Sequence, residues 1–225
     1  MLDIFEKYAV LGAFWMTIKL TFFSAIGALV LGTVLAVMRV SPVAVLSRLG
    51  AFYVNTVRNT PLTLLVFFSL AGPYYILQIS LTDRQSPTAI VDNNIRWAIV
   101  ALVVYHAAFV CEALRSGVNT VPVGQAEAAR SIGLTFTQSL REVILPQAFR
   151  GSIAPLGSVL IALTKNTTVA SVIGVAEASL LMSEIFENET ASVSVFLVFA
   201  LGFVVLTLPV GILFTSMSRR LAVKR

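Results

Sequence analysis

Charged residues, cysteine and histidine are all scarce in this sequence. Of its 225 residues only 12% are charged, whereas 57% are hydrophobic and the mean hydropathy is +0.90. A soluble domain carries roughly 25% charged residues, so this chain could not cover the surface of a soluble fold with polar groups. A bilayer removes that requirement because its interior is hydrocarbon. The composition therefore predicts an integral membrane protein.

Three further absences exclude classes of site. The one cysteine, Cys111, excludes an internal disulfide. With His106 as the single histidine, the usual zinc ligand sets cannot form, and we expect no metal site. The sequence lacks a G-x-x-x-x-G-K-[ST] phosphate-binding loop. We therefore expect no ATPase site, no enzyme activity and no bound cofactor in this chain.

Charge-free stretches locate the predicted spans, because a helix needs about 20 apolar residues to cross the hydrocarbon. Three stretches are long enough outright, and a fourth reaches that length if its helix continues past Glu112. The remaining stretch, 151–164, is short and resumes after the polar run Lys165-Asn166-Thr167-Thr168, so we expect an interrupted span there. The prediction is an all-α fold with one domain, 1–225, and about five transmembrane helices. The spans are roughly 10–38, 51–80, 96–118, 148–176 and 192–218, with a loop at 119–147.

The basic residues predict the orientation. The net charge is +5, but the cations lie between apolar segments rather than in one patch, so the lipid bilayer and not nucleic acid is the expected partner. Most of them follow spans one, three and five, which places the N-terminus outside and the C-terminus in the cytoplasm. The first residues are too acidic for a signal peptide, so we expect the first apolar run to be retained. The basic residues on the predicted cytoplasmic side are Arg39, Arg48, Arg115, Arg130, Arg141, Arg150, Arg219, Arg220, Lys224 and Arg225.

Small residues recur at every fourth position of the first span, at Ser24, Ala28, Gly32 and Ala36. Such a stripe lets two helix backbones approach closely in lipid. We interpret it as a packing face inside the bundle, with a contact to another subunit as the alternative.

The polar segment 119–147, between the third and fourth spans, predicts a helix–turn–helix, which we call the elbow. Gly133 is a natural helix stop because glycine accepts a left-handed conformation. A new helix is expected at Thr135, with Gln138 completing a capping box, and Pro146 is expected to break or kink it. An exposed, stiff elbow is suited to contact a soluble partner. The alternative is a solvated loop helix without a partner.

At this point the sequence resembles a known family. Glu127-Ala128-Ala129, Gly133, Val143 and Leu145-Pro146 are similar to the "EAA" loop of bacterial ABC import permeases, with Val143 where the family has isoleucine. The runs Arg58-Asn59-Thr60-Pro61-Leu62 and 165–174 are similar to the polar amino-acid branch. The resemblance covers nearly the whole chain and is closest to glutamate permeases of actinobacteria.

The resemblance implies a type I ABC importer permease fold in a bacterial cell membrane. It implies a second permease subunit, either homologous or identical, two cytoplasmic ATPase subunits that bind ATP and Mg, and an extracytoplasmic substrate-binding protein. The residues implied in ATPase coupling are Gln125, Glu127, Ala128, Ala129 and Gly133.

Ionisable residues within predicted spans indicate where substrate passes. A lysine at a helix centre costs roughly 2.5–3.5 kcal/mol on insertion scales, and an interrupted helix also exposes backbone groups that can hold substrate. Lys165 with its polar neighbours would suit a substrate carboxylate. Snorkelling of Lys165 and interfacial anchoring of Arg58 are the alternatives. The candidate substrate-binding residues are Lys165, Asn166, Thr167, Thr168, Arg58, Asn59 and Thr60.

Asn166 stands where permeases for cationic amino acids can carry an acid, so an acidic substrate is favoured. We therefore expect glutamate, with aspartate or glutamine as alternates. An ion-coupled secondary transporter working without an ATPase is the main rival, and a membrane scaffold is a third possibility. Glu112 and Arg115 are expected to form a structural ion pair, and no role is assigned to His106.

Overall fold

The computed structural model describes residues 7–189 and 193–221, and every regular element in these residues is helical. The predicted all-α fold is confirmed. Most elements are α-helices, η1 and η2 are π-helical turns, and η3 is a 3-10 helix. The elements are α2 (Val10–Val40), α3 (Ala44–Arg58), α4 (Leu62–Leu70), η1 (Ala71–Ile76), α5 (Ala89–Asn119), α6 (Val123–Ser131), α7 (Phe136–Gln138), η2 (Ser139–Ile144), α8 (Leu145–Asn166), η3 (Thr167–Ile173), α9 (Ala178–Asn188) and α10 (Val193–Leu221).

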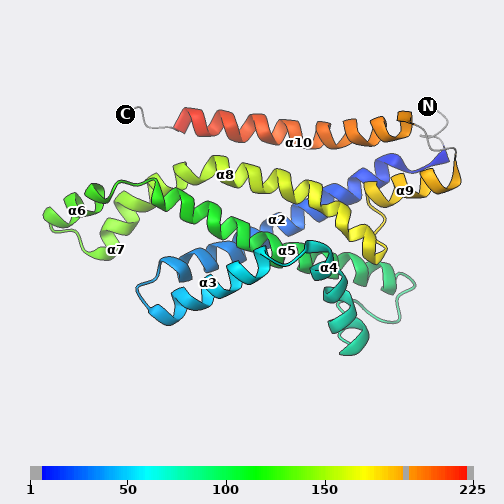
Figure 1. Ribbon diagram of the computed structural model, residues 1–225, viewed down its shortest axis with the longest axis horizontal. Coiled ribbons are helices and arrows are strands. Elements are labelled where there is room, and N and C mark those ends of the chain that lie inside the picture. Colours follow the sequence, from blue (N-terminus) through cyan, green and yellow to red (C-terminus); the bar gives the residue numbers. More distant parts are fainter. Residues whose placement is uncertain (1–6, 190–192, 222–225) are drawn as a thin grey trace.

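Within the described residues, four helices are long and apolar enough to cross a membrane. They run along the long axis of the molecule, with α8 between α5 and α10 (Figure 1). A shorter apolar helix, Leu62–Ile76, is the fifth candidate. The four long helices are Val10–Val40, Ala89–Asn119, Ser139–Ile173 and Val193–Leu221.

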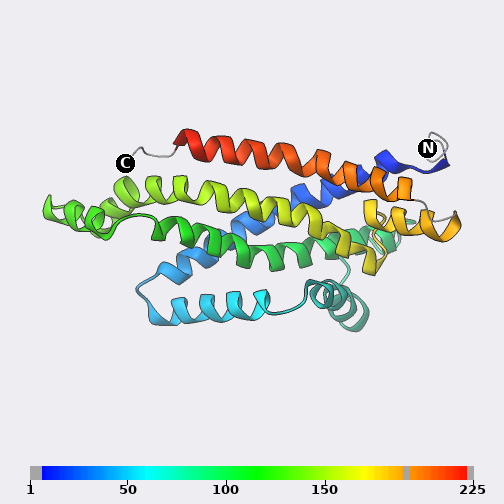
Figure 2. The ribbon, with the colours of Figure 1, turned by 45° about the horizontal axis from the view of Figure 1, so that its top comes forward.

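The predicted second span, 51–80, contains two helices rather than one. Helix α3 ends at Arg58 and α4 begins at Leu62, with Pro61 between them in an extended conformation. Proline has no N–H to donate, and it also disfavours a helical conformation at the residue before it. Figure 2 shows the result: α3 runs along the bundle, whereas α4 points in a different direction and is seen nearly end-on. There α4 packs against α5 and η3.

The small-residue stripe of α2 is a packing face inside the bundle, as predicted. Ser24, Ala28, Gly32 and Ala36 are all buried. A Cβ placed on Gly32 would lie 2.6 Å from the side chain of Val110 in α5 and 2.8 Å from a backbone oxygen of the same helix. The two backbones therefore approach as closely as small residues allow.

The helix around Pro146 is continuous, so of the two expected effects, a break or a kink, the break is wrong. Helix α8 begins at Leu145, directly after the π-helical turn η2, and Pro146 lies in its first turn. A proline within a continuous helix removes one backbone hydrogen bond, and its ring crowds the carbonyl one turn before it. The wider π turn accommodates the ring without ending the helix.

Candidate functional site

The turn of the elbow is held by glycine geometry and by two local caps. Gly133 has a φ of +88°, in the left-handed region. Its N–H donates to the carbonyl of Arg130 (3.0 Å), and the next N–H, of Leu134, donates to that of Ala129 (3.1 Å). This pair of bonds is the Schellman arrangement that ends a helix. The predicted helix stop at Gly133 is confirmed.

The second helix of the elbow starts with the predicted capping box. The backbone N–H of Thr135 donates to Oε1 of Gln138 (2.9 Å), and the N–H of Gln138 donates to Oγ1 of Thr135 (3.3 Å). These reciprocal bonds satisfy two donors that a helix start leaves unpaired. The elbow is therefore stiff on both sides of its turn.

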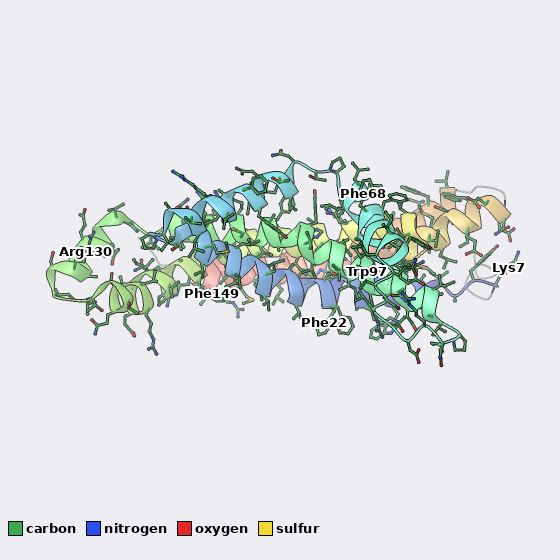
Figure 3. The ribbon with its side chains drawn as sticks, turned by 90° about the horizontal axis from the view of Figure 1, so that it is seen from below. Lys7, Phe22, Phe68, Trp97, Arg130 and Phe149 are labelled. Atoms are coloured by element: carbon green, nitrogen blue, oxygen red, sulfur yellow. The ribbon has the colours of Figure 1, made fainter. Side chains whose placement is uncertain are left out.

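The elbow projects beyond the helical bundle, with Arg130 at one end of the molecule and Lys7 at the other (Figure 3). Of the residues implied in coupling, Ala129 is buried, in a helix that packs against η2, whereas Gln125, Glu127, Ala128 and Gly133 are exposed. Two large apolar side chains are also exposed there, Val123 at 72% and Ile132 at 78%.

A continuous helical segment connects the elbow to the candidate substrate residues. From Phe136 through η2 and α8 the chain remains helical as far as Asn166. At 1.5 Å per residue this segment spans on the order of 45 Å. One uninterrupted helical segment therefore links the elbow to Lys165 and Asn166.

The expected interruption of the fourth span takes the form of a change in helix type. The α-helix ends at Asn166 and continues as the 3-10 helix η3, which ends at Gly174 with a φ of +76°. Lys165, in the last turn of α8, is exposed, and no ion pair to it is found in residues 7–189 and 193–221. A cation is thus presented at the change in helix type without a carboxylate from the described chain.

The neighbours of Lys165 differ in what they can offer a ligand. Asn166 is partly exposed, and its Nδ2 lies 3.1 Å from Nε2 of His106. Thr167 is fully buried and donates its hydroxyl to the carbonyl of Thr164 (2.8 Å). Thr168 donates its hydroxyl to the carbonyl of Lys165 (2.9 Å) and is partly exposed. Asn166 and Thr168 are therefore accessible to a ligand, whereas the hydroxyl of the buried Thr167 is used in a hydrogen bond within the helix.

The second candidate segment, Arg58 to Thr60, contacts the same part of α5. The Arg58 guanidinium lies over the ring of Phe109, 5.4 Å from its centroid. The side chains of Asn59 and Thr60 donate to carbonyls of their own helix. Of these three residues, Arg58 therefore has the most hydrogen-bond donors left for a ligand. His106 lies one turn before Phe109, with the ring centroids 6.2 Å apart. Helix α5 thus links both candidate segments.

An ionic cluster lies one turn after Phe109 in α5. Glu112 accepts from Arg115 at 3.1 Å, which confirms the predicted pair, and it also binds Arg39 of α2. The Arg39 side chain is only 14% exposed.

Sequence reasoning missed Arg39, Phe109 and the contact of His106. A lone histidine within a predicted span was a usable signal, because polar groups at that depth need a partner. Within the described residues no group of His, Cys, Asp and Glu could hold a metal ion.

Comparison with known proteins assigns the family. The model for binding-protein-dependent transport system inner membrane components matches residues 28–223. The chain belongs to this family. It is therefore a membrane component of a transport system and not its enzyme, as the sequence predicted, and its place is the inner membrane.

The relatives of this permease are amino-acid permeases. The glutamate transport system permease protein GluC of Corynebacterium glutamicum is 56% identical over 218 residues, which cover 96% of each chain. The probable glutamine ABC transporter permease protein GlnM of Bacillus subtilis is 32% identical, over 97% of this chain and 95% of the relative. A crystal structure of an amino acid ABC transporter with histidines superposes with a TM-score of 0.84 at 25% identity, covering 97% of both chains. The predicted ABC permease fold and family are confirmed.

Proposed function

We propose that this permease subunit forms the membrane path of an ATP-driven glutamate importer, with aspartate or glutamine as the alternate substrates. A relative that is 56% identical over 96% of both chains is a glutamate transport permease. Two further relatives, from Escherichia coli, are glutamate/aspartate import permeases at 30% identity.

The observation that carries the proposal is the environment of Lys165. A cation within a membrane span is costly unless it is paired, and Lys165, inside the candidate span Ser139–Ile173, has no carboxylate partner in the described chain. Asn166 and Thr168 beside it are accessible. A substrate carboxylate would supply the missing charge and would accept bonds from a charged donor, which are stronger than neutral ones. A cationic side chain would meet Lys165 as a like charge.

The proposed path also uses the loop before α4. Arg58 stacks on Phe109 and presents a second cation, with Asn59 and Thr60 at the same bend. Thr167, fully buried, supports the 3-10 turn in this proposal rather than touching substrate. The segment at Arg58 and the segment at Lys165 would then hold the two ends of glutamate, a small zwitterion with one additional negative charge.

The elbow is the proposed contact for two ATPase subunits, which would bind ATP and Mg outside this chain. Its capped turn and the exposed Gln125, Glu127, Ala128 and Gly133 support that role, with Ala129 packed beneath them. The elbow leads directly into α8, so the same helix would carry the motion to Lys165.

The orientation and the remaining partners follow from charge and family. Arg130 lies at the end of the molecule opposite to Lys7 (Figure 3), and the elbow end also carries Arg219 and Arg220. This supports an elbow and C-terminus in the cytoplasm and an N-terminus outside. A second permease subunit, homologous or identical, and an extracytoplasmic binding protein would complete the importer.

Uptake by the reconstituted complex tests the substrate. In proteoliposomes containing the permeases, the ATPase and the binding protein, we expect ATP-dependent glutamate uptake that excess arginine does not inhibit. Lys165→Gln should raise the glutamate KM about tenfold or more, because a hydrogen bond to a charged group is lost. The matched control, Lys7→Gln, removes the same charge at an exposed site and should leave uptake unchanged.

Two outcomes would overturn the proposal. One is robust arginine transport without glutamate transport. The other is glutamate uptake by the permease alone, driven by an ion gradient without ATPase, which would favour the secondary-transporter alternative.

A further inference from the structure

His106 is a buried polar residue that the proposed path does not yet explain. It is the single histidine of the sequence, it lies in the middle of α5, and it is 1% exposed. Its two ring nitrogens both have partners: Nδ1 lies 2.9 Å from the carbonyl of Leu102, and Nε2 lies 3.1 Å from Nδ2 of Asn166. The second contact joins residues 60 positions apart in the sequence.

The partners determine where the imidazole proton lies. The carbonyl of Leu102 can only accept, so Nδ1 must carry the hydrogen. The amide nitrogen of Asn166 can only donate, so Nε2 must be the unprotonated acceptor. A protonated, cationic ring would place two donors against each other at Nε2. With the amide nitrogen of Asn166 facing Nε2, the contacts match a neutral ring in the Nδ1–H tautomer.

The same contact determines where the oxygen of the Asn166 side chain points. A carboxamide is planar, so when its NH₂ group faces His106 its oxygen faces away from the imidazole. In residues 7–189 and 193–221 the contact to His106 is the one hydrogen bond found for the Asn166 side chain. Asn166 is also partly exposed, in the turn next to Lys165.

We infer that His106 is a positioning residue: it turns the Asn166 carboxamide so that the oxygen faces the substrate path and accepts a hydrogen bond from the substrate's α-ammonium group. Lys165 holds a carboxylate on the same turn. This inference rests on the proposed function, because it assumes that an amino acid passes Lys165. It assigns a role to a residue of α5 that itself touches no substrate.

The same contact makes an aspartate at position 166 unfavourable. A carboxylate in place of the amide would face the lone pair of Nε2, and a buried acceptor without a donor is costly. The ring could relieve this by taking up a second proton. The aspartate would then form an ion pair with the cationic ring and would no longer present an oriented acceptor to the substrate. His106 therefore matches a neutral amide and not an acid at this position.

Transport kinetics of the whole complex test the positioning role. His106→Phe keeps a ring but removes the acceptor, and should raise the glutamate KM about fivefold with little change in maximal rate. His106→Gln, whose side-chain oxygen can take the place of Nε2, should bring KM back to within about twofold of the unmodified complex. In an Asn166→Ala background, His106→Phe should have no further effect, because the group that it positions is absent. Val100→Phe, at an exposed site on the same helix, is the matched control.

A spectroscopic measurement separates this role from a purely structural one. With ¹⁵N-histidine in this subunit and an affinity tag free of histidine, the resonances lost in His106→Phe belong to His106. We expect one protonated and one unprotonated ring nitrogen, and a changed Nε2 shift in Asn166→Ala. An Nε2–H tautomer, a cationic ring or an unchanged shift would overturn the inference, as would additive KM effects of the two substitutions.

The two proposals fail in different ways. If the complex transports arginine and not glutamate, the proposed function fails while the tautomer and its dependence on Asn166 still stand. If glutamate is transported but His106 and Asn166 act independently, the function stands and the positioning role fails.

Discussion

The elbow and the middle of α5 are held in place by different means. The elbow depends on bonds within a few residues of one another: the Schellman pair at Gly133 and the capping box between Thr135 and Gln138. Its side chains are mostly exposed. The middle of α5 is packed against α2, α3, α4 and α8, and its polar side chains His106 and Glu112 each have a partner far along the chain besides a local one.

The difference fits the two roles that we propose, a contact for a soluble partner at the elbow and a part of the substrate path at α5. A site that accepts a soluble partner must keep its shape without neighbours, so local caps suit it. A site that meets substrate inside a bilayer must be built from several helices, because polar groups there need partners within the protein. Substitutions should therefore act through backbone conformation in the elbow and through packing in α5.

The largest effect is expected where α5 packs on α8. A Cβ at Gly117 would lie 2.0 Å from Oγ of Ser152 and 2.3 Å from the carbonyl of Ala148. Gly117→Ala must push the helices apart, and overpacking of this kind costs on the order of 3 kcal/mol. We expect a clear loss of thermal stability and of complex yield, measured by size exclusion. Gly72→Ala, in a helical turn with open space around it, is the control and should be close to neutral. Equal stability of the two variants would show that the packing argument is wrong.

A smaller and more specific effect is expected at Gly133. Nothing lies within 4 Å of a Cβ built there, so a side chain would act only through the positive φ. A left-handed conformation costs an ordinary residue roughly 1–2 kcal/mol, and more for a β-branched one. Gly133→Val should therefore deform the turn and reduce substrate-stimulated ATP hydrolysis, while membrane insertion stays intact.

Two further variants isolate the backbone effect at the elbow. Gly124→Val adds the same side chain in open space without a positive φ and should retain coupling. Gly133→Asn should restore much of the coupling, because asparagine tolerates the left-handed region. If ATPase binding and stimulated hydrolysis were unchanged in Gly133→Val, the coupling role of the elbow would be refuted.

The same contrast determines what the sequence could predict. The turn at Gly133 and the box at Thr135 were predictable, because their signals lie within a few positions. The long apolar helices and the buried stripe around Gly32 were also predictable, from composition and spacing. The one local signal that misled was Pro146, since a π turn before it let the helix continue.

The contacts of α5 could not be found in this way. His106 and Asn166 are 60 positions apart, and Arg39 and Glu112 are 73 apart. No periodicity connects such pairs, because they depend on how the helices cross. The prediction therefore placed Glu112 with Arg115, its neighbour on the same helix, and left Arg39 out.

The smallest effect is expected at an exposed pair far from both regions, where Lys7 meets Glu189 at the end of α9. The bond from Lys7 and its charge lower the pKa of Glu189 below its ordinary value of 4.5, and the bond to Glu189 raises the pKa of Lys7 above 10.5. The carboxylate therefore contributes stability above its unfolded pKa and loses it as the pH falls through the lower folded value. The lysine contributes below 10.5 and loses its share as the pH rises through its raised pKa.

The pair should thus be at full strength at neutral pH and lost once the pH has fallen below the lowered pKa of Glu189. We expect Lys7→Gln to lower the melting temperature slightly at neutral pH, since exposed pairs are weak and screened by salt. The difference between the variant and the unmodified chain should shrink as the pH falls, and added salt should shrink it at neutral pH. A difference that persisted in acid would have to come from packing of the lysine stem rather than from its charge.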